Sequence, residues 1–433
     1  MRQIFVASFA LFVICSGCKK DEPLQPHVPS IQLEVEDASC TEAWLKATTT
    51  EIPATIALLR DNHRVQILRL STSDSVLIDE GLLPNHRYVY QLQKLGVDSS
   101  VIEATESLQV TTMDTTSHDF MWQMETLGVT ASTLSDVAII SDNDVWAVGE
   151  LYLNDSSGQL DRIRYNAAHW DGNSWMVLRV PYYYQGQPLY NPIQTVFAFG
   201  QGDIWFAGNG VIHLNNQQYI PVTLPPAVWG ADRINKIWGV SSDDLYIVGD
   251  EGSVAHYFWG TWSRVESGTY GNLVDVWGYT VSNLGSPIVF SVGGTSGNVK
   301  LLTLSPTAAR DTLSWPSMED ATSIWTTNGF AIYAAGVGIW RNRGSSWQRM
   351  GGLPSGILFT RVRGSSSNNI FAVGSFGTLV HWNGTNWRQY GELPTDFRYQ
   401  GIAVSQNMVV AVGFTLSGVF ADRAAVVIGR GVR

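Results

Sequence analysis

Short segments rich in hydrophobic side chains, often alternating with polar ones, recur from residue 144 onward, and each ends in a glycine. These segments are Asp144–Gly149, Asp203–Gly208, Asp244–Gly249, Ile288–Gly293, Ala331–Gly336, Asn369–Gly374 and Met408–Gly413. Their closing glycines are separated by 59, 41, 44, 43, 38 and 39 residues. A two-residue period with many β-branched and aromatic side chains is typical of β-strands. The pattern predicts a series of similar β-units, each about 40 residues long.

The unit that contains Gly249 divides into four predicted strands. Arg233–Val240 is the innermost, Leu245–Gly249 the second, Val254–Phe258 the third and Trp262–Glu266 the outermost. Four antiparallel strands cannot bury both faces of their sheet alone, so neighbouring units must pack against one another. We expect an all-β protein in which residues 115–433 form a seven-bladed β-propeller.

The last unit lacks an outermost strand. Its innermost strand is predicted at Gly401–Ser405, and the chain ends at Arg433 without a further Trp-bearing strand. A spare strand, Phe120–Glu125, carries Trp122 and is similar to Asn386–Tyr390, an outermost strand of the preceding unit. We predict that the strand at 120–125 pairs with the C-terminal blade and closes the ring, because closure removes exposed strand edges.

The N-terminus has the pattern of an export signal. Residues 1–17 contain one Arg, a short apolar run and small residues, which is typical of a signal peptide. The run that starts at Cys15 and ends at Cys18 resembles a bacterial lipobox, although Cys15 stands where an aliphatic residue is usual. Lys19–Glu22 resembles the export tag of Bacteroidota surface lipoproteins. The resemblance implies lipidation of Cys18 and exposure on the outer membrane of a Gram-negative bacterium. Pro23, Pro26 and Pro29 predict an extended tether over 18–30. The alternative is a secreted protein cleaved elsewhere.

Residues 31–114 alternate in the manner of a small β-sandwich. Gly81–Tyr90 resembles the motif that precedes strand F of fibronectin type III domains. This resemblance makes Tyr88 the corner tyrosine, with its hydroxyl bonded to nearby backbone, and Trp44 a core residue. It implies a spacer domain. If Cys18 carries the lipid, Cys40 has no disulfide partner within the chain, and we expect it to be a small buried side chain.

Composition narrows the classes of function. The formal net charge is −11, which disfavours nucleic acid as a partner. The sequence contains no GxSxG, HExxH, CxxC or Walker motif, so we assign no catalytic residue, metal or cofactor. Because 38 carboxylates make some close pair inevitable, a glycosidase or lyase stays open as the alternative function.

Four histidines occupy the same predicted position in the third strand of four units: His169, His213, His256 and His381. Equivalent positions around a ring lie too far apart to bind one metal ion, so we expect each His to be bonded within its own unit. Asp171–Trp175 and Asn383–Trp387 resemble the Asp-box turns of sialidase-type propellers, with altered spacing. The repeats therefore resemble WD40 or sialidase-like propellers.

Two insertions lengthen the first unit, one at Leu151–Ile163 and the other at Tyr182–Asn191. Both connections emerge on the same side of a propeller, which we expect to bind a partner. The candidate contact residues on that side are aromatic: Tyr182, Tyr183, Tyr184, Tyr190, Trp229, Tyr270, Phe397 and Tyr399. Alternatively, these rings fold back and plug the channel.

A second set of candidates lies on the innermost strands: Phe197, Trp238, Trp277, Trp325 and Arg363. These side chains either line the channel as a ligand platform or pack between blades. Together the observations favour a lipid-anchored surface protein that binds a glycan or a protein, or serves as a scaffold. An enzyme acting on glycans would instead require two carboxylates about 5–10 Å apart in one pocket of the same side.

Overall fold

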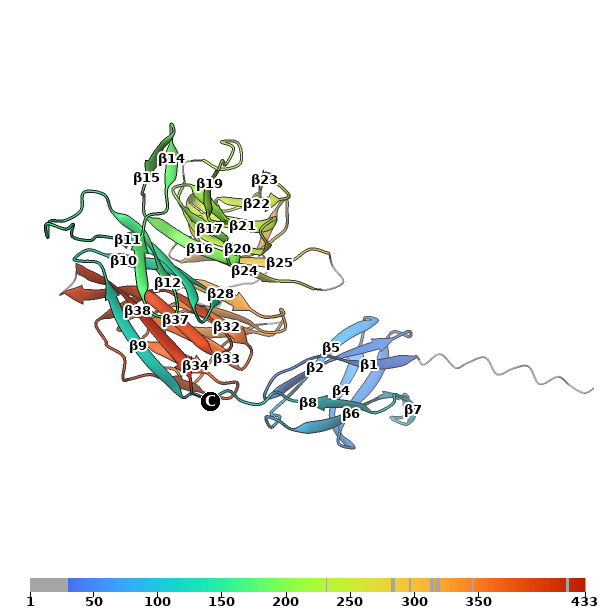
Figure 1. Ribbon diagram of the computed structural model, residues 1–433. Coiled ribbons are helices and arrows are strands. Elements are labelled where there is room, and N and C mark those ends of the chain that lie inside the picture. The colour runs from blue at the N-terminus through green and yellow to red at the C-terminus, as the bar shows by residue number, and fades with distance from the viewer. Residues whose placement is uncertain are drawn as a thin grey trace, which may run out of the picture. The chain divides into compact units, whose positions relative to one another are not determined.

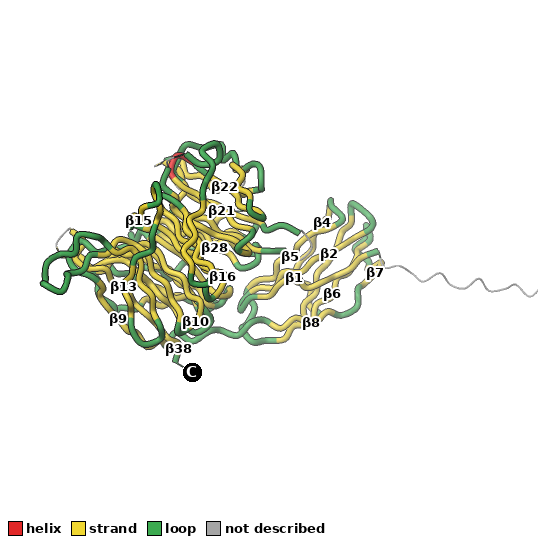
Figure 2. Tube along the Cα trace, turned by 45° about the horizontal axis from the view of Figure 1, so that its top comes forward, coloured by secondary structure: helices red, strands yellow, loops and turns green. Residues whose placement is uncertain are grey.

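The computed structural model describes residues 30–432, apart from 231, 282–284, 296, 312–314, 316–319, 345 and 418–419. Within this part of the chain the regular structure is β-strand, with one short 3-10 segment, η1 (Asp250–Gly252) (Figure 2). No helix found there is long and apolar enough to cross a membrane. The predicted signal peptide, Cys18 and the tether up to residue 29 lie outside the described residues.

Two compact units are present. The first comprises the described part of Met1–Glu34 together with Lys46–Leu77 and Val89–Leu108. The second comprises Val35–Leu45, Ile78–Tyr88 and the chain from Gln109 onward.

The strands before residue 112 form two antiparallel sheets (Figure 1). One sheet has the order β1 (Ile31–Ala38), β2 (Glu42–Thr49) and β5 (Asp74–Glu80). The other has the order β4 (His63–Leu70), β3 (Ala54–Arg60), β6 (Arg87–Leu95) and β7 (Val101–Ala104), with β8 (Leu108–Thr111) also on β6. The backbone N–H of Leu83 donates to the Tyr88 hydroxyl at 2.9 Å, as expected for that tyrosine. Trp44 and Cys40 are buried.

Apart from one two-stranded hairpin, the described strands after residue 119 form four-stranded antiparallel sheets, which we number 1 to 7 in the chain order of their innermost strands. The innermost strands are β10 (Thr133–Ser141), β16 (Ile193–Gly200), β20 (Ile234–Ser241), β24 (Leu273–Tyr279), β28 (Ser323–Thr326), β32 (Phe359–Ser366) and β36 (Phe397–Val404). The second strands are β11 (Asp144–Leu151), β17 (Asp203–Gly208), β21 (Asp244–Gly249), β25 (Ile288–Thr295), β29 (Ile332–Gly336), β33 (Asn369–Gly374) and β37 (Met408–Ser417). The third strands are β12 (Tyr165–Trp170), β18 (Val211–Asn215), β22 (Val254–Phe258), β26 (Asn298–Leu304), β30 (Gly338–Asn342), β34 (Leu379–Trp382) and β38 (Phe420–Gly431). The outermost strands are β13 (Trp175–Leu178), β19 (Gln218–Val222), β23 (Thr261–Arg264), β27 (Ala309–Asp311), β31 (Trp347–Arg349), β35 (Trp387–Gln389) and β9 (Phe120–Leu127).

The innermost strands surround a common axis. Each contacts the innermost strand of the next sheet, and β36 contacts β10, so the contacts form a ring. Hydrophobic clusters fill the spaces between neighbouring sheets, including the space between sheets 7 and 1. The chain therefore buries both faces of its sheets in the way a β-propeller does.

The repeated glycine has a steric cause. A Cβ placed on any of these seven glycines would lie 1.9–2.8 Å from a carbonyl oxygen at the start of the innermost strand. At Gly413, for example, the carbonyl oxygen of Arg398 lies 1.9 Å from the ideal Cβ position. Only glycine permits this close approach of two backbones.

β9 supplies the outermost strand of sheet 7, although it lies about 300 residues before β38 in the sequence. Trp122 stands opposite Gly429 in this pairing, and its ring packs against Tyr390 at a centroid distance of 4.7 Å. The innermost strand of sheet 7 begins at Phe397, earlier than the predicted Gly401. The strand continues through an unpaired residue between Tyr399 and Gly401. This bulge interrupts the two-residue alternation of side chains, so the sequence pattern did not show the first part of the strand.

Each histidine of the third strands is bonded within its own sheet, as predicted. Nε2 of His169, His213 and His256 lies 2.7–2.9 Å from an Asp side chain at the start of the second strand. Nε2 of His381 lies 3.1 Å from Asn369 Oδ1. Three of these rings also stack on an aromatic ring of the second strand at interplanar angles of 17° or less. The histidines therefore join the second and third strands.

Candidate functional site

In each sheet the connection between the second and third strands and the connection to the next sheet emerge on the same side. We call this side the insert face, because it carries the long connections of sheet 1, residues 152–164 and 179–192. The second connection forms its own hairpin of β14 (Tyr182–Tyr184) and β15 (Gln187–Leu189), which projects from the propeller in Figure 1.

The two long connections are tied together by Arg179. Its Nη2 donates to Asp161 at 2.7 Å and to the carbonyl oxygen of Ile163 at 2.6 Å. Its guanidinium lies 3.7 Å from the centre of the Tyr165 ring and 5.8 Å from that of Tyr190. These contacts make the two connections one structural element.

A polar hollow opens at the centre of the insert face, where the innermost strands begin. Six of these strands have a register shift at the same place, which leaves one residue out of the ladder. Such bulges redirect a side chain. The unpaired residues, together with Thr322 just before β28, all line the hollow: Ser135, Gln194, Asn235, Val274, Thr322, Thr360 and Gln400. The hollow is thus bordered mainly by amide and hydroxyl groups.

Three charged side chains also line this hollow. Asp250 accepts a hydrogen bond from Asn235 at 2.9 Å and lies 3.7 Å from Arg233, which is half-exposed. Arg361 donates through Nη1 to the carbonyl oxygens of Thr322 and Thr360 at 3.0 and 2.9 Å. Its Nε is buried and has no hydrogen-bond acceptor within the described part of the chain.

Deeper in the channel, two buried ion pairs cross between sheets. The Lys236 ammonium donates to both oxygens of Asp136, at 2.7 and 2.6 Å. The Arg363 guanidinium holds Asp275 in a two-point contact at 2.7 and 3.0 Å.

Each aspartate also accepts from a hydroxyl of the next sheet. Thr195 donates to Asp136 at 2.8 Å, and Ser323 donates to Asp275 at 2.6 Å. Sheets 1, 2 and 3 thus contribute an aspartate, a hydroxyl and a cation in that order, and sheets 4, 5 and 6 contribute the same three groups in the same order.

Charge controls the protonation of these groups. Burial alone would raise the pKa of the Asp275 carboxyl, but Arg363, with Arg361 and Lys236, outweighs burial and holds that pKa at about 2. Burial lowers the pKa of the Lys236 ammonium, and Asp136 opposes that effect. In both pairs, each charge is desolvated together with its partner.

The candidate residues of the innermost strands have different surroundings. Trp238 and Trp325 are buried between sheets. Phe197 and Trp277 are half-buried and line a second, largely apolar cavity at the other end of the channel, beside Arg363. The Arg363 guanidinium lies 4.6 Å from the centre of the Trp277 ring, a cation–π contact.

The eight aromatic candidates of the connections also separate into groups. Tyr183 and Tyr270 are 48% and 93% exposed, and Tyr190 is partly exposed. The backbone of Tyr184 pairs with Gln187. Four rings are buried in cores between sheets, where no partner can reach them: Tyr182, Trp229, Phe397 and Tyr399. We leave these four out of the binding surface, because they stabilise the sheets from which the connections emerge.

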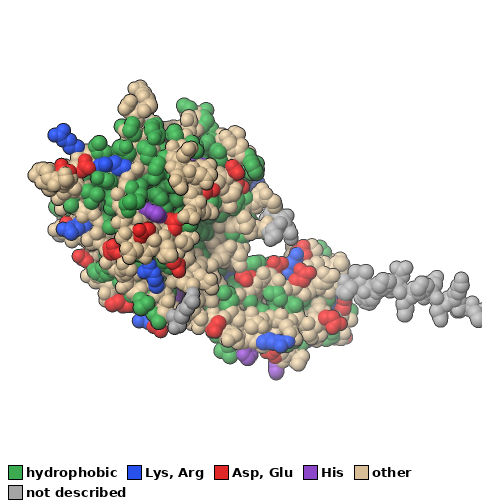
Figure 3. Space-filling model, in the orientation of Figure 1, with side chains coloured by type: hydrophobic (Ala, Val, Ile, Leu, Met, Phe, Trp, Pro, Cys, Tyr) green, Lys and Arg blue, Asp and Glu red, His purple; other side chains and the backbone are tan. Residues whose placement is uncertain are grey.

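Further apolar side chains are exposed on the insert face. They belong to its connections or to strand ends beside them: Leu160, Ile163, Leu189, Leu358, Phe376 and Phe420. Figure 3 shows hydrophobic side chains gathered over the β14–β15 hairpin and the neighbouring part of sheet 2. Exposed apolar side chains that gather in one patch are typical of protein-binding surfaces.

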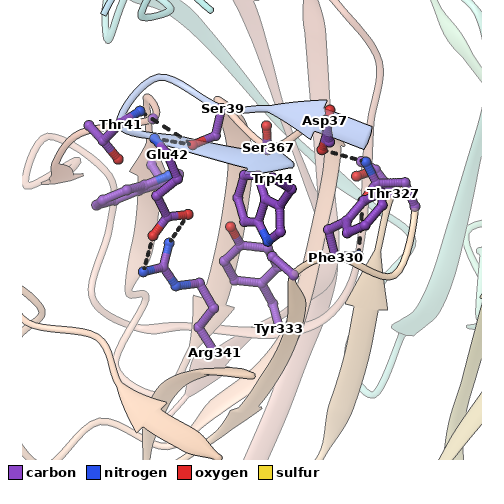
Figure 4. Close-up of a pocket in the computed structure, with 14 residues that line it drawn as sticks. Asp37, Ser39, Thr41, Glu42, Trp44, Thr327, Phe330, Tyr333, Arg341 and Ser367 are labelled. Carbon is purple, nitrogen blue, oxygen red and sulfur yellow. Dashed lines mark hydrogen bonds and ion pairs between the residues drawn. The ribbon is translucent and has the colours of Figure 1, made fainter. Parts of the chain in front are cut away.

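A third cavity lies within the second compact unit (Figure 4). Its polar groups already bind one another. Arg341 and Arg343 contact the Glu42 carboxylate at 3.0 and 2.7 Å, and Asn328 donates to Asp37 at 2.6 Å. The internal pairing leaves little for a ligand to bind.

Comparison with known proteins shows the fold. No protein-family model matches the chain, and no curated protein matches it. Two solved structures of YCF48, one bound to a D1 peptide and one from Cyanidioschyzon merolae, match 72% of this chain at 15% identity with TM-scores of 0.53. These matches cover 95% and 98% of those chains. The chain therefore has a β-propeller fold.

Two further structures show weaker similarity. The WD40 β-propeller domain of Doa1 matches 72% of this chain at 12% identity, with 98% of that chain covered and a TM-score of 0.49. PorZ is a bacterial surface component of the type-IX secretion system of Porphyromonas gingivalis. It matches 87% of this chain at 9% identity, with 61% of that chain covered and a TM-score of 0.47.

The hollow is equipped for hydrogen bonding. Asp250 is the only carboxylate among the described residues that line it, and Asn235 and Arg233 already contact that carboxylate. Sequence patterns did not identify the hollow, because its residues lie beside bulges. The sequence did contain one indication of a polar site, namely charged side chains within otherwise apolar innermost strands, such as Asp136, Lys236 and Asp275.

Proposed function

We propose that the insert face binds an extended polypeptide segment of a partner protein, with the polar hollow at its centre. The observation that carries this proposal is the bulge in successive innermost strands, which turns amide and hydroxyl side chains into one hollow. Such groups donate to and accept from peptide units without requiring a fixed charge. A scaffold role would use the same surface.

The surroundings of the hollow favour a protein over a glycan. Aliphatic side chains such as Ile163 and Leu189 are exposed on the two long connections, the second of which also carries Tyr183. Aliphatic groups pack on apolar side chains, whereas sugars prefer flat aromatic platforms and polar groups. A solved YCF48 structure contains a bound peptide, which shows that a propeller of similar fold can serve this role. No contact in the described residues favours the glycosidase or lyase alternative.

The remaining organisation is proposed from the sequence. Residues 1–17 are a signal peptide, Cys18 is lipidated, and 18–30 tether the protein to the surface of the outer membrane. Residues 31–114 form a fibronectin type III-like spacer, a proposal supported by the Tyr88 hydroxyl contact and the order of the two sheets. Sheets 1 to 7 are the blades of a closed seven-bladed propeller over 115–433.

Affinity measurements with the purified protein test the binding surface. The probe is an array of random octapeptides, followed by calorimetry on the peptides that bind. Gln194→Ala combined with Gln400→Ala should weaken binding at least ten-fold, because both side chains border the hollow. Trp259→Asn is the matched control, since Trp259 is exposed on the opposite side and Asn tolerates its positive φ. The proposal fails if the control weakens binding as much, or if no peptide binds.

A further inference from the structure

The charged side chains of the channel do not balance. Asp136 and Asp275 are each neutralised by their own cation, Lys236 or Arg363. Arg361 lies beside this network and forms no ion pair with any carboxylate that the structure describes. The Arg361 charge is therefore surplus.

The geometry of Arg361 leaves donors for a ligand. Only Nη1 is bonded, and it donates to the two backbone carbonyl oxygens at the border of the hollow. The Nε has no acceptor in the described part of the chain, but it is buried and out of reach of a ligand. Nη2 is therefore the nitrogen of Arg361 left to donate to a carboxylate oxygen in the hollow.

The charges around Arg361 favour the binding of an anion at this residue. The protein carries a formal net charge of −11, so anions are repelled from most of its surface. Within the hollow, Asp250 is offset by Arg233 at 3.7 Å, which leaves a local excess of one positive charge. A positive centre with low solvent exposure, bordered by neutral donors, favours a compact anion.

We propose that the hollow binds a carboxylate of the partner polypeptide, and that Arg361 is the residue that anchors it. This proposal rests on the proposed function of the insert face. The carboxylate comes from a peptide C-terminus or from an Asp or Glu side chain, and both place two oxygens in one plane. Thr322, Thr360 and Gln400 border the same hollow and supply hydroxyl and amide groups around the anion.

The test uses paired octapeptides on an array. Each random sequence is made with a free C-terminus and as the C-terminal amide, and each Asp or Glu is paired with Asn or Gln. We expect bound peptides to lose at least ten-fold in affinity when their carboxylate is removed. The C-terminal pairs and the side-chain pairs show which source is used. Raising the salt concentration should weaken binding, because the contact is between charges.

Variants locate the effect. Arg361→Gln should abolish the preference for carboxylate peptides, and Arg361→Lys should restore part of it. Arg398→Gln is the control, since Arg398 is exposed on β36, does not line the hollow and undergoes the same change in charge. If Arg361→Gln does not fold, competition by acetate and by the acid and amide peptides on the unaltered protein decides the question.

The outcomes separate this proposal from the proposed function. Equal binding of acid and amide forms, or unchanged preference in Arg361→Gln, overturns the carboxylate site and leaves peptide binding intact. Absence of all peptide binding overturns both. Binding only to acidic sugars, such as N-acetylneuraminic acid, also overturns both, because the partner would then be a glycan.

Discussion

At the residue scale, removing one partner of an ion pair in the channel is expected to destabilise the fold. Asp275→Ala leaves the Arg363 guanidinium buried without its carboxylate, which should cost about 3–5 kcal/mol of unfolding free energy. Urea denaturation at pH 7 measures this loss. Asp275→Asn should cost less, because it still accepts from Ser323. A loss under about 1 kcal/mol for Asp275→Ala would contradict the pairing.

The pH dependence of the same pair has a definite sign. The folded pKa of Asp275, about 2, lies below its usual 3.8, so the carboxylate stabilises the fold above pH 3.8. That contribution is lost as the pH falls from about 4 toward 2. The difference between the unaltered protein and Asp275→Asn should therefore shrink over this interval.

His381 gives a second dependence on pH. Burial, with His118 and Arg388 nearby, lowers its pKa from 6.5 to about 3. The unfolded chain takes up a proton below pH 6.5 and the folded chain does not, so stability falls as the pH decreases from 6.5 toward 3. The expected slope is about 1.4 kcal/mol per pH unit. In His381→Asn, the fall in unfolding free energy between pH 7 and pH 5 should be smaller; parallel curves would contradict this explanation.

At the scale of elements, β9 is predicted to stabilise the whole propeller. Deleting Phe120–Glu125 exposes an edge of β38 and removes Trp122 from the core between sheets 6 and 7. The Trp122→Ala substitution alone should cost about 3–5 kcal/mol. Calorimetry should show a large fall in melting temperature for the deletion. Equal melting temperatures would show that β9 is dispensable.

The hairpin of β14 and β15 offers a matched pair of tyrosines. Tyr182 is 7% exposed and packs in the core between sheets 1 and 2, so Tyr182→Ala should lower the melting temperature. Tyr183 is exposed, so Tyr183→Ala should leave the melting temperature unchanged and weaken peptide binding by about 1–2 kcal/mol. Thermal unfolding with calorimetric titration separates the two effects. If Tyr183→Ala instead melts several degrees lower with binding intact, that ring supports the fold.

The sequence pattern predicted those elements that depend on contacts within a single sheet. The glycine that ends each second strand reflects one backbone contact, so it repeats and is visible in the sequence. The sequence repeats also placed Phe197, Trp238 and Trp277 at equivalent positions of their innermost strands. In the structure each of them is paired with an aromatic residue of the second strand. The bulges and the pairing of Asp136 with Lys236 depend on contacts across sheets, and no local period records them.

At the scale of the whole molecule, anchoring is predicted to depend on one residue outside the described part of the chain. Cys18→Ala should release the protein from membranes, because the thioether-linked lipid supplies the apolar chains that hold it. Labelling of cells with a fatty-acid analogue, followed by fractionation, measures this. Labelling that persists in the variant would contradict the assignment of Cys18.

Binding of a polypeptide on the insert face is best tested by locating a bound peptide. An octapeptide selected on the array and carrying a photoreactive benzophenone is cross-linked to the unaltered protein, and the attached residues are found by mass spectrometry. We expect attachment to the connections at 152–164 and 179–192 and to residues that line the hollow. Attachment to the turns of the opposite side, such as the one that contains Trp259, would contradict it.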